Sequence, residues 1–82
     1  MGALDGNAIA GQLYDYFGAE MTAARGACAH CGAEAQIAEL QVYTRAPGAV
    51  ARCRTCSSVV MVLVEVRGRT QVNLDGFRLD EP

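Results

Sequence analysis

The sequence predicts a small mainly-β protein of the zinc-ribbon class, in which antiparallel hairpins are stapled by one metal ion and preceded by one N-terminal α-helix. Three observations predict it: two Cys-x-x-Cys pairs, alternating apolar and polar residues around them, and a helical apolar pattern confined to the first 17 residues. The chain has 82 residues, of which 51% are hydrophobic. A chain of this length has room for one core, so we expect a single domain over residues 1–82.

The N-terminal helix is expected over residues 5–17. Apolar side chains recur there every three or four positions and would form one face of the helix: Ile9, Leu13, Tyr16 and Phe17. Asp5 can cap the start of the helix, and Gly18 is suited to a left-handed stop. We expect the apolar face to cover the β ribbon rather than to bind a partner, because such faces usually pack on a core.

The metal-binding β ribbon is expected over residues 21–76. Strands are predicted over residues 21–27, 36–44, 49–52, 58–67 and 70–74, with turns at Ala46-Pro47-Gly48 and Gly68-Arg69 and a loose tail over residues 80–82. The run Val59–Val64 is apolar on both faces, so either the N-terminal helix or another chain must cover its second face. Burial by the helix is the simpler expectation, and a homo-oligomer formed through this strand is the alternative.

Cys28, Cys31, Cys53 and Cys56 are the predicted metal ligands. Each pair has a two-residue gap, which lets both sulfurs of a tight turn reach one ion. The 21 residues between the pairs match a hairpin that brings the two turns together. Four cysteines complete a tetrahedral shell and leave no open position for water or substrate. We therefore expect one structural zinc ion per chain.

Two alternatives to this zinc site come from the same turn. His30 lies inside the first pair and could replace a cysteine or act as a base, but a complete thiolate shell does not need it. The Cys-x-x-Cys-Gly turn, here ending at Gly32, also occurs in rubredoxins, where iron carries electrons, and thiolate sites accept either metal. We favour zinc, because Ser57 stands where the second turn would have its glycine and a rubredoxin's aromatic-rich core is absent.

The sequence carries no recognisable catalytic machinery. It has no glycine-rich phosphate loop, no serine elbow and only one histidine, so we predict that the protein is not an enzyme. Its longest apolar run is far short of the roughly 20 residues that cross a bilayer, and the N-terminus does not resemble a secretory signal. We therefore expect a cytoplasmic protein that does not associate with a membrane.

All seven basic residues are arginine. Five of them lie in the sequence around the second cysteine pair: Arg45, Arg52, Arg54, Arg67 and Arg69. Arginine suits bidentate contacts with phosphate or carboxylate. The formal net charge is −2; four thiolates add four negative charges and a divalent ion two positive ones, so the loaded protein would carry −4. This charge, and the lack of stacking aromatics among the arginines, argue against nucleic acid as a partner.

Four stretches of the chain together resemble a known family: Leu4–Gly11, the two cysteine pairs, Tyr43–Gly48 and the Val-Met-Val-Leu-Val run that starts at Val60. The chain resembles the short actinobacterial proteins that are classed as a domain of unknown function with a predicted zinc ribbon. The resemblance covers nearly the whole chain. It implies the ribbon, metal binding by the same four cysteines and a bacterial cytoplasmic setting. It also implies a link to flavin- or molybdenum-dependent oxidoreductases, near which such proteins are encoded.

The leading functional hypothesis is a non-catalytic, zinc-stabilised adaptor or accessory subunit. It would bind another protein, such as an oxidoreductase component, through the arginine-bearing ribbon or the apolar strand. The first alternative is a rubredoxin-like iron protein that transfers electrons, and the second is a nucleic-acid-binding zinc ribbon. An electron carrier would be coloured and redox-active, whereas a nucleic-acid binder would show salt-dependent affinity.

Overall fold

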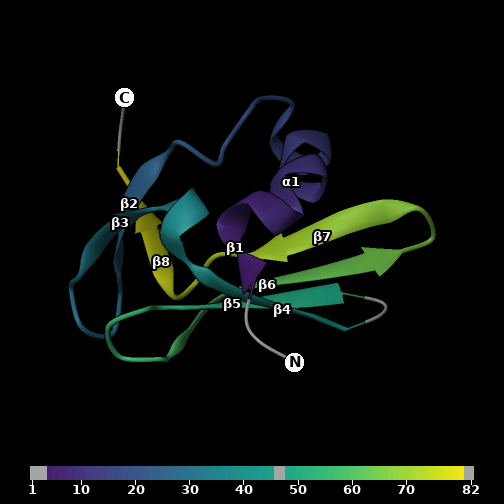
Figure 1. Ribbon diagram of the computed structural model, residues 1–82. Coiled ribbons are helices and arrows are strands. Elements are labelled where there is room, and N and C mark those ends of the chain that lie inside the picture. Colours follow the sequence, from purple (N-terminus) through teal and green to yellow (C-terminus); the bar gives the residue numbers. More distant parts are fainter. Residues whose placement is uncertain (1–3, 46–47, 81–82) are drawn as a thin grey trace.

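The computed structural model, which describes residues 4–45 and 48–80, contains two antiparallel sheets and one α-helix (Figure 1). The elements in chain order are β1 (Leu4–Asp5), the 3-10 helix η1 (Gly6–Ile9), α1 (Ala10–Phe17), β2 (Arg25–Cys28), β3 (Glu34–Gln36), the 3-10 helix η2 (Ile37–Glu39), β4 (Gln41–Arg45), β5 (Gly48–Arg52), β6 (Val59–Val66), β7 (Arg69–Asn73) and β8 (Phe77–Leu79). The larger sheet has the order β1-β4-β5-β6-β7, and the smaller one β3-β2-β8. The predicted class is confirmed: mainly β, antiparallel, with one N-terminal helix and four clustered cysteines.

The N-terminal helical segment is divided in two. Where one helix was expected over residues 5–17, Asp5 belongs to β1, η1 forms a tight first turn, and α1 begins only at Ala10. The predicted cap and stop are confirmed: the Asp5 carboxylate accepts a hydrogen bond from the Asn7 N–H at 3.0 Å, and Gly18 ends α1 with a φ of 74°. Among the described helices, none has the length and apolar character needed to cross a bilayer.

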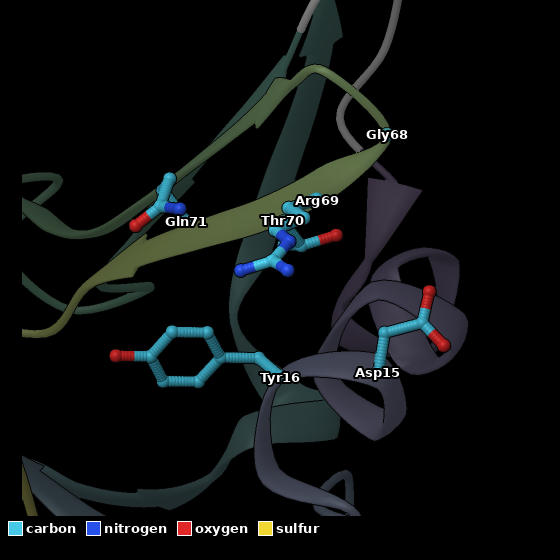
Figure 2. A pocket seen from close by; sticks show the side chains of 6 residues that line it. All are labelled: Asp15, Tyr16, Gly68, Arg69, Thr70 and Gln71. Carbon is cyan, nitrogen blue, oxygen red and sulfur yellow. The ribbon is translucent and has the colours of Figure 1, made fainter.

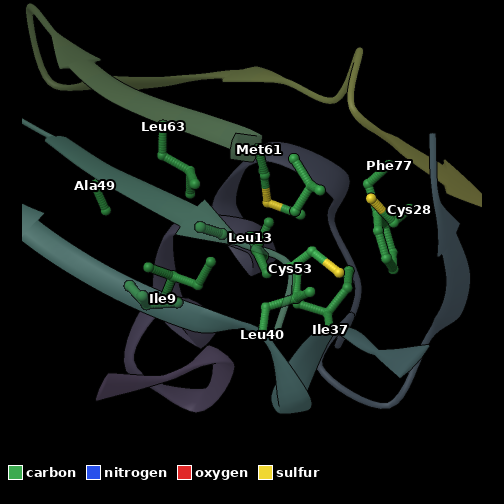
Figure 3. Close-up of a cluster of buried hydrophobic side chains, with 13 residues drawn as sticks. Ile9, Leu13, Cys28, Ile37, Leu40, Ala49, Cys53, Met61, Leu63 and Phe77 are labelled. Carbon is green, nitrogen blue, oxygen red and sulfur yellow. The ribbon is translucent and has the colours of Figure 1, made fainter. Parts of the chain in front are cut away.

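The core lies between the helical segment and one face of the larger sheet (Figure 3). Pairing of β4, β5 and β6 aligns Val42, Ala51 and Met61 in one cross-strand row. Cross-strand partners share a face of the sheet, so this row and Leu63, two residues beyond Met61, define what we call the helix face. The remaining buried side chains extend this core toward the smaller sheet: Ile9, Leu13, Cys28, Ile37, Leu40, Ala49, Cys53, Val60 and Phe77.

Tyr16 does not join this core, although its spacing predicted that it would. Leu13 is fully buried and Phe17 is partly buried, but Tyr16 is 47% exposed. In α1, residues 13 and 17 are one helical turn apart and face the same way, whereas residue 16 lies about 60° to one side of residue 13. The Tyr16 ring packs edge-on against the Phe17 ring, with 5.0 Å between their centroids. The buried stripe of the helix is therefore narrower than predicted.

The opposite face of the larger sheet has an apolar centre flanked by Gln41, Gln71 and Asn73, and the helix does not cover it. Its apolar side chains, which define what we call the outer face, come from three strands: Tyr43, Val50, Val62, Val64 and Val66. Figure 1 shows α1 on one side of the sheet only. The expectation that the helix would bury the second face of Val59–Val64 is therefore wrong. A helix of eight residues can cover only one face of a five-stranded sheet, and it covers the face of Met61 and Leu63.

The predicted strand over residues 36–44 is interrupted. Gln36 ends β3, and its backbone N–H donates to the Glu39 carboxylate at 2.7 Å, which closes a capping box around η2. The chain leaves the smaller sheet at this turn and enters the larger one as β4. The strand expected over residues 21–27 is likewise shortened to β2, because Met21 and Ala24 are joined in a turn by a backbone hydrogen bond of 3.0 Å. The ribbon is thus two sheets rather than one.

The C-terminal strand β8 was not predicted. It pairs with β2, so the β structure extends beyond residue 76 to Leu79. The Asp80 N–H then donates to the Arg25 carbonyl at 2.9 Å, so the loose tail expected over residues 80–82 is wrong at Asp80, and residues 81–82 lie outside the described part. Only three residues long, β8 offers too little alternation for its pattern to indicate a strand.

The two predicted hairpins of the larger sheet are present. In the first, Arg45 pairs with Gly48, while the rest of the expected turn, residues 46–47, lies outside the described residues. In the second, the turn residues are Arg67 and Gly68, one position earlier than predicted. Their φ values of 52° and 77° are both positive, as a two-residue type I′ turn requires.

Candidate metal centre

The first cysteine pair lies in a tight turn at the end of β2, which we call the first knuckle (residues 28–33). The Cys28 N–H donates to the Ala33 carbonyl at 2.9 Å, and the Gly32 N–H donates to the Cys28 carbonyl at 2.8 Å. The turn also directs the His30 N–H at the Cys28 Sγ, 3.3 Å away. The backbone of this turn therefore both closes the loop and stabilises negative charge on a sulfur.

The second cysteine pair follows β5 and repeats this construction in the second knuckle (residues 53–58). The Cys53 N–H donates to the Ser58 carbonyl at 3.0 Å, and the Ser57 N–H donates to the Cys53 carbonyl at 2.9 Å. The Thr55 N–H lies 3.3 Å from the Cys53 Sγ. Each hydrogen bond has its equivalent in the first knuckle, so the two pairs present their sulfurs in the same way.

The knuckles differ at the position that follows the second cysteine. Gly32 and Ser57 both have a positive φ, of 80° and 64°. This conformation costs a residue with a side chain about 1–2 kcal/mol but costs glycine little. The suitability of Gly32 and the poorer fit of Ser57, inferred from the sequence, are confirmed.

We expect Ser57→Gly to stabilise the metal-loaded protein by about 1 kcal/mol, because it removes the cost of the left-handed conformation. Gly32→Ser should destabilise by a similar amount. A Cβ at Gly32 would meet no atom within 4 Å, so the effect there reports the backbone alone. Thermal unfolding in excess metal measures both variants. If both substitutions raised or both lowered the melting temperature, the two knuckles would not share the same backbone requirement at this position.

The four cysteine sulfurs meet at one point. All of them lie within 4.8 Å of one another, and the Cys28–Cys56 and Cys31–Cys53 sulfur pairs are each 3.7 Å apart. A tetrahedron of thiolates about 2.3 Å from a zinc ion has edges of about 3.8 Å. A disulfide would need about 2.05 Å, and all four cysteines are free. The cluster therefore fits one tetrahedral metal ion with a complete shell.

The cluster joins the two sheets. Cys28 is the last residue of β2 in the smaller sheet, whereas Cys53 directly follows β5 of the larger sheet. Both are buried among the core side chains, where Figure 3 shows Cys28 beside Phe77, while Cys31 and Cys56 are exposed. His30 is exposed, and its ring is not part of the group of ligand atoms. A bound ion would hold the two sheets together at this end.

The environment gives the two exposed thiols different acidities in the metal-free protein. Hydrogen bonds from the Ser58 hydroxyl and backbone N–H lower the pKa of Cys56 to about 6. The Ala33 N–H also lowers the pKa of Cys31, but desolvation and hydrogen bonds with the other cysteine sulfurs prevail and raise it to about 12. A divalent ion must displace the remaining protons, so metal affinity should fall as the pH falls.

Ser58 was not singled out in the sequence. It stands two residues after Cys56, as Ala33 does after Cys31, and both positions donate a backbone N–H to the second sulfur of their knuckle. The spacing could have indicated this role. In both knuckles the first residue after Cys-x-x-Cys has a positive φ, and the backbone N–H of the second residue donates to the sulfur of the preceding cysteine.

A family model matches residues 1–80, and its description is "Family of unknown function (DUF6510)". The chain belongs to DUF6510. This confirms the resemblance to a family of unknown function, while the actinobacterial origin inferred with it stays a prediction. No curated protein and no solved structure matches the chain. The functional argument for this DUF6510 protein therefore depends on its own residues.

Four of the five arginines near the second cysteine pair in sequence have side chains that the structure describes, and these four are divided in space. Arg52 and Arg54 lie at the metal end, where the Arg52 Nη1 donates to the Ser57 carbonyl at 2.8 Å and braces the second knuckle. Arg67 and Arg69 lie at the β6–β7 turn, at the other end of the larger sheet (Figure 1). The described side chains of this DUF6510 protein therefore form no single arginine cluster around the cysteines.

A surface hollow of about 510 Å³ lies between the end of α1 and the start of β7 (Figure 2). Its lining is largely polar: Asp15, Tyr16, Gly68, Arg69, Thr70 and Gln71. It is remote from the cysteine knuckles, which lie at the opposite end of the molecule (Figure 1). These lining residues include neither a histidine nor a cysteine. We therefore base the functional argument on the metal centre.

Proposed function

We propose that this DUF6510 protein is a zinc-stabilised, non-catalytic adaptor or accessory subunit that binds another protein in the cytoplasm. The observation that carries the proposal is the complete shell of four sulfurs shared between two sheets. A zinc ion with four thiolate ligands has no open position for substrate, so its contribution is to stability. A small domain with two sheets and one short helix gains most from such a cross-link.

The apolar outer face supports the binding half of the proposal. Tyr43 and Val66, which lie on it, are 42% and 48% exposed. Contiguous apolar surface on a small protein marks an interaction site more often than single exposed residues do. The family resemblance favours an oxidoreductase component as the partner. Nucleic acid is less favoured, because Arg52 and Arg54 lie at one end of the sheet and Arg67 and Arg69 at the other.

A rubredoxin-like iron protein is the second candidate function. Each knuckle directs a backbone N–H at a buried sulfur, at 3.3 Å in both, and hydrogen bonds of this kind tune the potential of iron–thiolate centres. Cys31 and Cys56 are exposed, which would give electrons a short path to the surface. Zinc is favoured because the strained Ser57 replaces the second glycine of the iron-binding turn.

Elemental analysis with a visible absorption spectrum tests the metal half of the proposal. The protein is purified from a bacterial host grown with both zinc and iron. We expect one equivalent of zinc and no visible absorption. One equivalent of iron with thiolate charge-transfer bands would replace the adaptor with the electron carrier. A variant in which both exposed ligands are changed, Cys31→Ser with Cys56→Ser, controls for metal bound elsewhere.

A further inference from the structure

We propose that the outer face of the larger sheet is the docking surface of this protein, and that its partner presents an apolar strip bordered by carboxylates. The inference rests on the proposed adaptor function and specifies its surface and the chemistry of its partner. From the sequence, the arginine-bearing ribbon and the apolar strand were two alternative binding surfaces. In the structure, arginines lie at the ends of the apolar strip.

The centre of the outer face is apolar. The pairing of β4 with β5 and of β5 with β6 aligns Tyr43, Val50 and Val62 in one cross-strand row. Val64 lies two residues along β6 and Val66 two residues further, so both point the same way. The three strands therefore present a continuous strip of one aromatic and four aliphatic side chains, of which Tyr43 and Val66 are the most exposed.

No described element covers this strip. The helical segment packs on the helix face, and the smaller sheet lies beside one end of the larger sheet (Figure 1). The strip is thus the second apolar surface of a sheet whose first surface already forms the core. An antiparallel sheet commonly has one wet face, and that face is normally polar. The apolar side chains on the outer face are therefore better explained by contact with a partner than by a need to form the core of this domain.

Arginines lie at both ends of the strip. A register shift in β6 places Val59 opposite Arg52, so Val59, 36% exposed, extends the strip toward the metal end beside a guanidinium. At the other end Arg69 pairs with Val66, and Arg69 also lines the hollow with Asp15 and Tyr16 of α1 (Figure 2). Pairing across strands places Arg52 beside the strip at the metal end and Arg69 at its rim, on the edge strand β7. The face is cationic at its two ends although the protein has a net charge of −2.

Carboxylates are nearly absent from the outer face. Strands β5, β6 and β7 place none there, because Glu65 pairs with Thr70 on the helix face. Asp5, opposite Gln41 at the far edge of the sheet, is already engaged with the Asn7 N–H. A guanidinium beside apolar surface forms strong bidentate bonds with a carboxylate. The matching partner surface is therefore apolar at its centre and acidic at its ends.

A second copy of this chain fits the surface less well. A two-fold contact between two outer faces would place the arginine at each end of one strip near an arginine of the other, and like charges brought together in an interface are costly. Nucleic acid also fits less well, because four of the five side chains of the strip are aliphatic and cannot stack on bases as aromatic rings do. A protein surface that is apolar at its centre and acidic at its ends matches both the aliphatic strip and the arginines of the outer face.

The test uses an unbiased library of displayed 12-residue peptides, selected on the immobilised, metal-loaded protein. We expect the enriched peptides to combine aliphatic residues with aspartate or glutamate. Val64→Glu and Arg69→Glu should each weaken binding of the enriched peptides by at least about tenfold. The matched control is Arg78→Glu, which makes the same charge change on β8 of the smaller sheet and should leave binding unchanged. If Val64→Glu fails to fold, Val66→Glu replaces it, because Val66 is half exposed.

Several results would overturn the inference. Enriched peptides that are basic or have no charge bias, or peptides whose binding survives both outer-face substitutions, would exclude this surface. Two other results would also exclude the proposed partner. One is a dimer, seen in sedimentation, that Val64→Glu dissociates; the other is displacement of the peptides by a single-stranded oligonucleotide.

Affinity purification from a bacterial host separates failure of the surface from failure of the adaptor function. A partner retained equally by wild type and by both outer-face variants would exclude the outer face but leave the adaptor standing. The absence of any partner with wild type would contradict the adaptor function itself.

Discussion

Replacing Cys53 with serine should leave the chain largely unfolded at room temperature. Cys53 is buried, and its sulfur is one of the two that reach the cluster from the larger sheet. Structural zinc in zinc-finger peptides contributes roughly 10–16 kcal/mol of apparent binding free energy, whereas whole domains are stable by roughly 5–15 kcal/mol. Serine removes one ligand and places a hydroxyl in the core. Circular dichroism, the dispersion of amide proton shifts and metal content measure the result.

The matched control for this variant is Thr55→Ala. Thr55 contributes its backbone N–H to the Cys53 Sγ, and its side chain is exposed. The alanine variant keeps that hydrogen bond and should bind metal and melt as wild type does. If Cys53→Ser also melted as wild type does, the cysteine cluster would not be a structural metal site, and the proposed role of zinc would have to be abandoned.

The two cysteine turns of the candidate metal centre were predictable from sequence because the determinants of each turn are local. A two-residue gap within each pair fixes how two sulfurs can meet at one ion, and the need for a positive φ at Gly32 follows from the same turn. The cap at Asp5 and the stop at Gly18 are local in the same sense. Each of these features depends on residues within six positions of one another, and all were found where the sequence placed them.

The division into two sheets was not predictable in the same way. Strands β3 and β8 have three residues each and exist because both pair with β2, from opposite sides. Strands this short are stabilised by partners distant in sequence, so their own residues carry little signal. One local signal for the change of sheet was present: Gln36 and Glu39 have the spacing of a capping box, which indicates a helical turn inside a predicted strand.

The outer face is the other feature that the sequence left open. Val59–Val64 reads as apolar throughout, and only the structure shows that Met61 and Leu63 meet the helix while Val62 and Val64 do not. Its relation to Arg52 and Arg69 depends on the register shift in β6 and on the position of the β6–β7 turn. Both are set by pairing between strands, and periodicity along a single strand does not contain that information.

A second large effect is expected at Gly6, which lies in η1 where the chain approaches η2. A Cβ added at Gly6 would lie 1.8 Å from the Ile37 carbonyl oxygen and 2.9 Å from the Ala38 Cα. Both are backbone atoms, so the clash cannot be relieved by turning a side chain. Gly6→Ala must therefore push η1 away from η2, at the point where the chain passes between the two sheets. We expect a loss of about 3 kcal/mol, at the upper end of overpacking effects.

Gly11→Ala is the matched control. It is the same substitution five residues away, but it is expected to raise the stability rather than lower it. Gly11 is exposed in α1, and a Cβ there would meet no atom within 4 Å. Alanine should stabilise the helix by up to about 1 kcal/mol. Thermal unfolding of both variants in excess zinc compares them at equal metal loading. A domain of this size shifts its melting temperature by roughly 4–8 °C per kcal/mol, so the two variants should differ by more than about 12 °C. Equal melting would mean that η1 and η2 do not approach as closely as the structure places them, and the junction between the sheets would then depend on the metal alone.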